Sequence, residues 1–392
     1  MFRSALALTI SAGFAVPLTL AAAADQSVQD SQMPSIASIP AEAKSDGNSW
    51  QLLTEIPGDR QPVAFGDGGR RLLTLNPDML QVWQTHSGKA IAEIVTDGDT
   101  RFIDAALSPD GNRAAAIVQT LSTQTLQLQI WHVETGAVIR QRPQTLAHSL
   151  GEEAFPVGSS LNQLAFAPDG NLVSQVVLAA DAETAPAEVR LRRHNGETGQ
   201  VLQSLETGPD TAVRQFTFSL DGTLLAGVST MSTGPESAVR QVVDIWRLTN
   251  GTHLMRLEPL EDNRWSLVDI VFNPAGSLEV LSQWLYDVRL DTWDVTTGKR
   301  LQRRTRISDI DRQDRFGRLS PDGTHYFVRS DVAGTRLINL DHQTVQTLPI
   351  YAETALFDRQ GHRLAIATQT DIHLYMLKPS DPLAAEKSIQ LD

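Results

Sequence analysis

Histidine is the side chain that most often binds metals and transfers protons near neutral pH, and this chain has nine: His86, His132, His148, His194, His253, His325, His342, His362 and His373. No two of them stand at the spacing of a metal-binding pair such as His-Glu-x-x-His. A Gly-x-Ser-x-Gly nucleophile turn and a Gly-rich phosphate loop are also absent. Asp309-Ile310-Asp311 begins like a calcium loop but lacks the other ligands. We therefore predict no catalytic residue, no metal and no cofactor.

The charge balance and the cysteine content exclude further classes of protein. The 392 residues include 33 Lys and Arg against 46 Asp and Glu, a formal net charge of -13. A nucleic acid partner is not expected, because neutralising phosphates requires a basic surface. The chain contains no cysteine, which excludes disulfides, thiolate metal sites, a cysteine nucleophile and a lipoprotein anchor.

Aromatic residues and arginines gather in one stretch, where they could bind a partner. Arg264-Trp265 and Trp284-Leu285-Tyr286 precede a basic run that contains Lys299, Arg300, Arg303, Arg304, Arg306, Arg312, Arg315 and Arg318, interleaved with Asp309, Asp311 and Asp314. Trp, Tyr and Arg dominate the hot spots of protein interfaces. The predicted binding residues are therefore Arg264, Trp265, Trp284, Tyr286, Arg303, Arg304 and Arg306. For the arginines the alternative is surface pairing with aspartates, which contributes little to stability.

An internal repeat determines the elements that must position these residues. An apolar residue, two further residues, usually Asp, and then Gly recur seven times: Phe65 to Gly69, Leu107 to Gly111, Phe166 to Gly170, Phe218 to Gly222, Phe272 to Gly276, Leu319 to Gly323 and Phe357 to Gly361. Successive glycines are 42, 59, 52, 54, 47 and 38 residues apart. Asp-Gly predicts a tight turn, because glycine accepts a positive φ.

A second pattern follows the first in each unit, and consists of alternating apolar residues, an aromatic residue and a glycine five residues later. It is present at Trp83 to Gly88, Trp131 to Gly136, Trp246 to Gly251 and Trp293 to Gly298. His194 takes the Trp position before Gly199, Ile338 and Gln343 take both positions in the sixth unit, and Tyr375 stands without the glycine. The period-two alternation between the turns indicates strands.

Each unit therefore contains four antiparallel strands, a to d, with short a–b and c–d turns. Seven such units predict an all-β fold, a seven-bladed β-propeller with four-stranded antiparallel blades. The paired motifs resemble the bacterial WD-repeat β-propellers, in degenerate form, over Trp50 to Leu377. The Gly-His pair of that family is missing, and its Trp-Asp dipeptide occurs only at Trp293-Asp294. A periplasmic TolB-like propeller, which shares the Pro-Asp-Gly turn, is the alternative within this fold.

The seventh unit offers only three strands, near Thr354 to Phe357, Arg363 to Ala367 and Ile372 to Leu377. The strand-like segment Trp50 to Ile56 lies before the first unit. We expect it to supply the outer strand of the last blade, because this closure removes two open sheet edges at once. Deleting it should destabilise the whole ring. The Phe and Leu residues of strand a and the Trp residues of strand c are expected to pack between blades.

The connections divide between two faces of the propeller. The a–b and c–d turns belong to one face, and the b–c and d–a connections belong to the other, which is the top face in the usage of the WD-repeat family. Four insertions are expected over one sector of the top face: Thr120 to Thr125, Pro143 to Ser160, Ala180 to Glu188 and Met231 to Ala238. Long loops on a rigid scaffold commonly bind partners, and neutral drift in loop length is the alternative. Arg264, Trp265, Trp284 and Tyr286 are expected on the same face.

The first residues have the features of a secretory signal peptide. Arg3 gives a basic start, an uncharged stretch runs to Ala24, and three alanines precede Asp25 as signal peptidase requires. A transmembrane anchor is the alternative, which Pro17 disfavours. The expected organisation is a signal peptide at 1–24, a flexible linker at 25–49, the β-propeller at 50–378 and a C-terminal tail at 379–392.

These observations predict a non-catalytic protein–protein interaction scaffold, exported to the bacterial periplasm, the cell envelope or the extracellular space, that binds a protein partner through top-face loops. No transmembrane segment is expected after signal cleavage. The alternative is a propeller enzyme of the hydrolase or lactonase type, with carboxylates or histidines from several blades converging on the central channel. A sensor that binds a glycan or a peptide through the same loops is a third hypothesis.

Overall fold

The computed structural model describes residues 49–123, 125–144, 164–178, 188–207, 211–231, 240–260, 264–285, 287–305, 314–330 and 334–378. The chain divides into two units, Met1–Glu42 and Ala43–Asp392, and every described residue belongs to the second. The expected signal peptide, the C-terminal tail and all of the expected linker except Ser49 lie outside the described residues.

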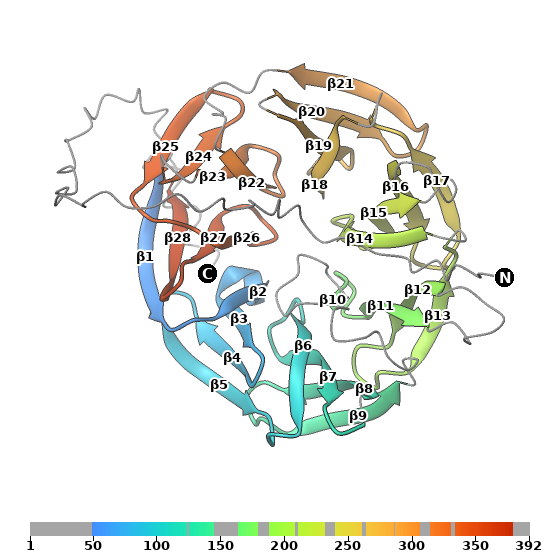
Figure 1. Ribbon diagram of the computed structural model, residues 1–392, viewed down its shortest axis with the longest axis vertical. Coiled ribbons are helices and arrows are strands. Elements are labelled where there is room, and N and C mark those ends of the chain that lie inside the picture. The colour runs from blue at the N-terminus through green and yellow to red at the C-terminus, as the bar shows by residue number, and fades with distance from the viewer. Residues whose placement is uncertain are drawn as a thin grey trace, which may run out of the picture. The chain divides into compact units, whose positions relative to one another are not determined.

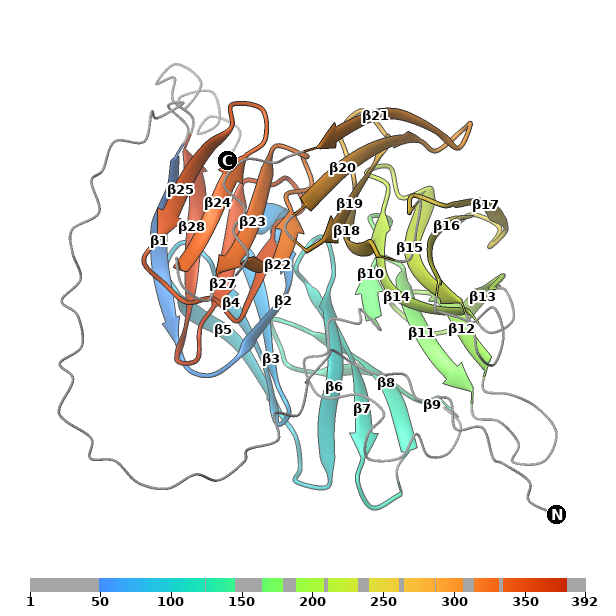
Figure 2. The same ribbon diagram turned by 45° about the horizontal axis from the view of Figure 1, so that its top comes forward.

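The second unit is a ring of seven four-stranded antiparallel sheets around a common axis (Figure 1). In each sheet the first strand lies nearest the axis and the fourth lies at the rim (Figures 1 and 2). The prediction of an all-β, seven-bladed β-propeller is therefore confirmed. A 3-10 helix, η1 (Asp67–Gly69), is the only helix among the described residues.

The strands of the first four blades follow the repeat. Blade 1 consists of β2 (Gln61–Gly66), β3 (Arg71–Asn76), β4 (Met79–Gln84) and β5 (Lys89–Val95). Blade 2 consists of β6 (Thr100–Leu107), β7 (Arg113–Thr120), β8 (Thr125–His132) and β9 (Val138–Gln144). Blade 3 consists of β10 (Leu164–Phe166), β11 (Leu172–Leu178), β12 (Glu188–His194) and β13 (Val201–Leu205). Blade 4 consists of β14 (Thr211–Phe218), β15 (Leu224–Met231), β16 (Arg240–Arg247) and β17 (His253–Leu257).

The last three blades complete the ring. Blade 5 consists of β18 (Ser266–Phe272), β19 (Leu278–Trp284), β20 (Asp287–Asp294) and β21 (Lys299–Thr305). Blade 6 consists of β22 (Asp314–Leu319), β23 (His325–Ser330), β24 (Gly334–Asn339) and β25 (Thr344–Leu348). Blade 7 consists of β26 (Thr354–Phe357), β27 (Arg363–Ala367), β28 (Asp371–Lys378) and β1 (Ser49–Pro57).

The N-terminal strand closes the ring as expected. β1 pairs antiparallel with β28, so that Trp50 lies opposite Leu377 and Ile56 lies opposite Ile372. The side-chain amide of Gln346 in blade 6 donates to the Trp50 carbonyl at 2.8 Å and accepts from the Trp50 amide at 2.9 Å. Blade 7 thus contains strands from both ends of the repeat region, and it is joined to blade 6 through a strand from the other end of the chain.

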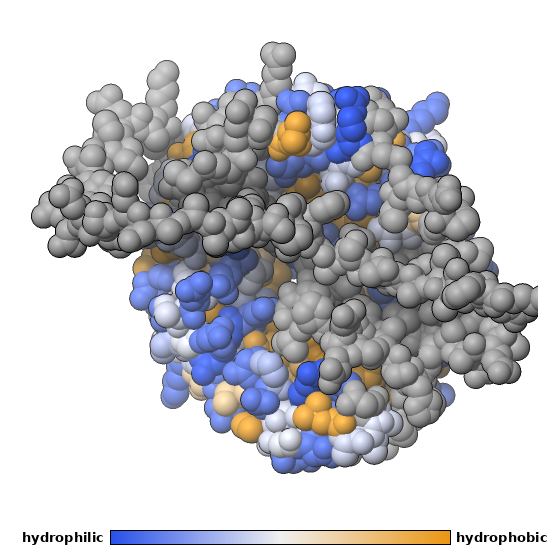
Figure 3. Space-filling view, viewed as in Figure 1, coloured by the Kyte–Doolittle hydropathy of each residue, from blue (hydrophilic) through white to orange (hydrophobic). Residues whose placement is uncertain are grey.

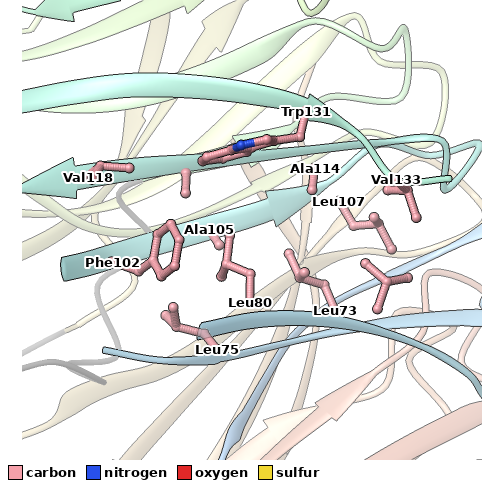
Figure 4. Packing of buried hydrophobic residues seen from close by; sticks show 12 residues of the cluster. Leu73, Leu75, Leu80, Phe102, Ala105, Leu107, Ala114, Val118, Trp131 and Val133 are labelled. Carbon is pink, nitrogen blue, oxygen red and sulfur yellow. The ribbon is translucent and has the colours of Figure 1, made fainter. Parts of the chain in front are cut away.

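Apolar side chains fill the space between neighbouring blades. Between blades 1 and 2, Leu73 and Leu80 of one sheet pack against Phe102, Leu107 and Trp131 of the next (Figure 4). The strand c tryptophans are all buried, namely Trp83, Trp131, Trp246 and Trp293. Their expected packing role is confirmed. Full burial of a side chain of this size contributes about 2–3 kcal/mol in transfer free energy.

Polar partners of the strand c aromatic differ from blade to blade. The Trp83 indole donates to the Thr74 hydroxyl on strand b at 2.9 Å. In blade 3, His194 takes the Trp position and lies 2.8 Å from the Ser174 hydroxyl at the equivalent place on strand b. Trp246 donates instead to the carbonyl of Glu206 in blade 3, at 2.5 Å. The hydroxyl contact from strand b therefore persists in blades 1 and 3.

The tight turns explain the repeated glycines. Gly111, Gly170, Gly222, Gly276, Gly323 and Gly361 of the a–b turns all have φ between 71 and 81. This left-handed conformation is readily accessible to glycine. In the c–d turn of blade 6, Gln343 takes the place of glycine and is held at φ 54. The degenerate sixth repeat therefore keeps the turn geometry at a cost in backbone strain.

Candidate interaction site on blade 5

Blade 5 brings two of the predicted binding residues together at its top end. Trp265 directly precedes β18, and Trp284 is the last residue of β19. Because Ser266 pairs with Gln283, the two strand ends lie side by side. The indole rings are 6.2 Å apart between centroids, at an interplanar angle of 51°. The expected position of these two tryptophans on the top face is confirmed.

Two guanidinium groups cover the tryptophan pair. Arg264 lies over the Trp284 ring, with its Cζ 4.6 Å from the centroid, and Arg289 of β20 lies over the Trp265 ring at 3.5 Å. Contacts of this kind contribute about 0.5–2 kcal/mol, depending on solvent exposure. Trp265 is only 5% exposed, so its main role is packing. Arg264 is exposed and Trp284 is half-buried, so both can contact a partner.

Leu285 extends this cluster into solvent. It is 63% exposed and has a left-handed backbone with φ 51. The Gln283 side-chain amide donates to its carbonyl at 3.1 Å, which supports the turn. Tyr286, the next predicted binding residue, lies outside the described residues. We refer to Arg264, Trp265, Trp284, Leu285 and Arg289 as the blade 5 cluster.

The predicted basic residues lie apart from the tryptophans, on the outer strand β21. Arg303 donates from Nε and Nη2 to the two oxygens of Asp291, at 2.8 and 2.9 Å. Asp291 is buried, and Arg300 also approaches it, at 3.7 Å. Arg304 lies 3.4 Å from Asp341 of blade 6. The alternative of arginine–aspartate pairing thus describes Arg303 and Arg304, while Arg306 lies outside the described residues.

Blade 4 repeats this arrangement at the equivalent positions. Arg256 donates from Nε and Nη2 to Asp244 at 2.7 and 3.0 Å, and His253 contacts the same carboxylate at 2.8 Å. Burial opposes ionisation of Asp244, but the hydrogen bonds with Arg256 and His253 outweigh it and hold its pKa below the ordinary value. A buried carboxylate two residues before the Trp, paired with an arginine on the outer strand, is therefore a brace within the blade.

A shallow groove of about 370 Å³ lies beside the blade 4 brace. It is lined by Glu206 and Thr207, which follow β13 of blade 3, and by His253 and Arg256 of β17, the outer strand of blade 4. This groove could not be predicted from the sequence, because its residues come from two repeats and none belongs to a recognised motif. The one indication in the sequence was the pair of Asp244 on β16 and Arg256 on β17, which lie opposite each other.

The inner strands place carboxylates near the central channel, but these join blades to one another. Asp269 on β18 accepts hydrogen bonds from the side chain of Gln215 in blade 4 and from the backbone amide of Leu319 in blade 6. Burial raises the pKa of Asp269 above its ordinary value. Asp104 on β6 similarly accepts from the backbone amide of Leu164 in blade 3, at 2.8 Å.

One arginine joins blades that are not neighbours. Arg359, in the a–b turn of blade 7, donates to the carbonyl of Leu220, in the a–b turn of blade 4, at 2.6 Å. Partial burial lowers the pKa of Arg359. Because inner-strand turns surround the axis and blades 7 and 4 are not adjacent, this side chain crosses the mouth of the channel on the face opposite the blade 5 cluster.

Several expected features fall on residues that the structure does not describe. Most of the four top-face insertions lie at 145–163, 179–187 and 232–239, outside the described residues, although β7 and β8 bound the first insertion at Thr120 and Thr125. Within the described ranges no group of three or more His, Asp or Glu residues could hold a metal ion. No helix in that part of the chain is long and apolar enough to cross a membrane.

A comparison with protein-family models and with curated proteins found no match. The fold is therefore the firm basis for classification, as a seven-bladed β-propeller with four-stranded blades. On the face shown in Figure 3, apolar side chains of the described residues form small separate spots within a hydrophilic surface.

Proposed function

We propose that this protein is a non-catalytic interaction scaffold, exported to the periplasm or cell envelope of a bacterium, that binds a protein partner through the top face of blade 5. The signal-like residues 1–24 support export. The resemblance of the paired motifs to WD-repeat propellers supports the class. Propellers of this kind hold their loops on a rigid ring, and loops on rigid scaffolds commonly carry binding residues.

The closed ring supports a binding role in a physical way. Each blade buries apolar side chains against both neighbours, and β1 joins the last blade to the start of the chain. Side chains at the strand ends are therefore fixed in position in the free protein, before a partner binds. Such preorganisation lowers the entropy cost of association.

The observation that carries the proposal is the blade 5 cluster. Arg264 and Trp284 are of the residue types that dominate interface hot spots, and they lie stacked at the surface. Next to them, an exposed leucine is held in a left-handed conformation that bulky residues rarely adopt. Strained, exposed residues of this kind concentrate at functional sites.

Site-specific photo-crosslinking in living cells tests this proposal. A photoreactive phenylalanine analogue replaces Leu285, and the same analogue replaces Val138, an exposed residue that begins β9 beside the c–d turn of blade 2, on the opposite face. Position 285 is expected to give a discrete crosslinked band, and position 138 is not.

Two surface substitutions serve as the matched control. Arg264→Ala together with Trp284→Ala should abolish the band at position 285 without changing the melting temperature by more than a few degrees. Trp265 is left intact because it is buried. Equal crosslinking at positions 285 and 138, or a band that survives both substitutions, would contradict the proposed site.

Export is tested by sequencing the N-terminus of the protein recovered from the periplasmic fraction. The signal-like pattern predicts that the first residue of the mature chain is Asp25. A chain that stays in the cytoplasm and begins at Met1 would contradict this part of the proposal.

A further inference from the structure

The outer strands share a feature that the repeat pattern does not reveal. In blades 1 to 5 and 7, the outer strand contains one residue that has no partner on strand c, the strand with which it pairs. This extra residue forms a β-bulge. The extra residues are Ile91, Ile139, Leu202, Leu254, Leu301 and Leu53. An aliphatic side chain at the same place in six blades indicates a shared packing role.

In four of these blades the bulge residue packs against the following blade. Ile91, Ile139, Leu254 and Leu53 are partly buried against clusters that contain residues of the next sheet. In three of these clusters the strand c tryptophan of that next sheet is present, namely Trp131, Trp293 and Trp83. The bulge residue therefore normally helps to seal the rim between two blades.

Leu301 of blade 5 departs from this pattern. It is 61% exposed, and the next blade carries Ile338 where those three sheets carry tryptophan. Leu202 of blade 3 is also exposed, at 48%. The two outer strands differ in charge, since β21 contains four basic residues whereas β13 has no charged residue.

The basic residues of β21 divide between its two sides. Arg300 and Arg303 lie opposite Trp293 and Asp291, and both approach the Asp291 carboxylate. Lys299 and Arg304 lie opposite Asp294 and Leu290, on the side that faces blade 6.

The side that faces blade 6 retains positive charge. Among the residues that the structure describes, Lys299 has no ion pair, and Arg304 pairs only with the exposed Asp341, at 3.4 Å. Exposed pairs of this kind contribute about 0–1 kcal/mol, so a partner's carboxylate can replace Asp341 at little cost. We call Lys299, Leu301 and Arg304 the β21 ledge.

We propose that the β21 ledge binds an extended acidic segment of a protein partner, an inference that rests on the proposed scaffold function. An apolar side chain of the segment covers Leu301, and carboxylates on either side pair with Lys299 and Arg304. The residues opposite Lys299 and Arg304 on β20 are four positions apart, about 13 Å along a strand. Two acidic residues four apart, with a leucine midway, match this spacing because alternate side chains of an extended segment point the same way.

Fluorescence anisotropy with a labelled peptide tests the inference on the full-length protein. The probe contains Glu-Ser-Leu-Ser-Glu between Gly-Ser flanks, and the matched peptide carries Lys in place of both Glu residues. The acidic probe is expected to bind at least about tenfold more tightly at low salt, a difference of about 1.4 kcal/mol. Added salt should weaken its binding, because exposed charges are screened.

Surface variants assign the binding to the ledge. Leu301→Ser with Arg304→Glu should weaken the acidic probe at least about tenfold, while Leu202→Ser, at the equivalent exposed bulge of blade 3, should leave it unchanged. Equal binding of the acidic and basic probes, or unchanged binding to the double variant, would overturn the inference. A dimer in sedimentation that the Leu301→Ser variant converts to a monomer would also overturn it, because the ledge would then join two copies of this chain.

The peptide experiment and the crosslinking experiment can fail independently, so failure of this inference is distinguishable from failure of the proposed function. Crosslinking at position 285 tests whether blade 5 contacts a partner at its top end, and the peptide tests the chemistry of the rim. Crosslinking at position 285 with no selective peptide binding would contradict only the proposed role of the β21 ledge. Peptide binding without any crosslink would instead contradict the proposed role of the blade 5 cluster.

Discussion

At the scale of single residues, the structure pairs buried charge inside individual blades. Asp244 and Asp291 are both buried, and each accepts two hydrogen bonds from an arginine on the outer strand. Burying a lone carboxylate costs several kcal/mol, so such a group persists only when it is paired and hydrogen-bonded. These pairs therefore brace the outer strand, and the pair with Asp291 explains why Arg303, which was predicted to bind a partner, faces inward.

Removing one member of the blade 4 brace should destabilise the protein strongly. Asp244→Asn leaves the partly buried guanidinium of Arg256 without its counter-ion, and we expect a loss of about 3 kcal/mol in the free energy of unfolding. Adding Arg256→Gln should recover part of this loss. Urea denaturation of the two variants and the parent measures both effects, and an Asp244→Asn loss below about 0.5 kcal/mol would show that the pair does not brace the blade.

The same pair has a defined pH dependence. Because the folded-state pKa of Asp244 is lowered from 3.8, its stabilising contribution is present above pH 3.8 and is lost as the pH falls through the lower folded value. The difference in stability between the parent and Asp244→Asn should therefore shrink in acid.

The buried His194 should make the folded protein less stable in acid, whereas a histidine paired with a carboxylate would make it more stable. Burial lowers its pKa from 6.5 to about 4, so the unfolded chain takes up a proton before the folded chain does. Its contribution to stability falls between pH 6.5 and about 4, by about 3 kcal/mol in total. Urea denaturation across this range should show a steeper loss for the parent than for His194→Phe, and parallel curves would contradict the assignment.

At the scale of elements, the blades follow from local chemistry. The Asp-Gly turns and period-two strands are encoded within a few residues, so blade number, strand order and the closing strand could be predicted from the repeat. The side-chain partners between blades could not. Gln346 meets Trp50 across 296 positions of sequence, and Arg289 covers Trp265 only because the β19–β20 hairpin folds back on itself. Such contacts depend on how neighbouring sheets pack.

The link between blades 6 and 7 can be tested with one substitution. Gln346→Leu removes both hydrogen bonds to the Trp50 backbone while it retains most of the side-chain volume. We expect a loss of about 1–3 kcal/mol, because two partly buried backbone groups lose their partners. Thermal and urea unfolding measure this change. Gln302→Leu, on the exposed outer strand of blade 5, should change stability by less than about 0.5 kcal/mol.

At the scale of the whole propeller, the ring determines which surfaces are available for binding. Inner-strand carboxylates and Arg359 are used to join blades, and the bulge residues of the outer strands mostly seal the rim. Within the described part of blade 5, the surface residues of the blade 5 cluster at the top and the β21 ledge at the rim remain exposed. The sequence located both regions by composition, but only the packing of the blades separates the buried residues from the exposed ones.

The surface positions of the blade 5 cluster and the β21 ledge depend on closure of the ring through β1 in the observed register. The chain has no cysteine, so a single introduced pair can report this register without interference. Glu55 on β1 lies directly opposite His373 on β28, and directly opposite residues in antiparallel strands bring their Cβ atoms close to the separation that a disulfide bridges.

The most direct test is oxidation of the Glu55→Cys/His373→Cys variant, with Leu52→Cys/His373→Cys as the mismatched control. The closed ring predicts nearly complete disulfide formation in the matched pair, measured by mass spectrometry, and a higher melting temperature that is lost on reduction. The control should form little disulfide in the folded protein. Absence of a disulfide in the matched pair, or equal yields from both pairs, would contradict the closure and the surface assignments that depend on it.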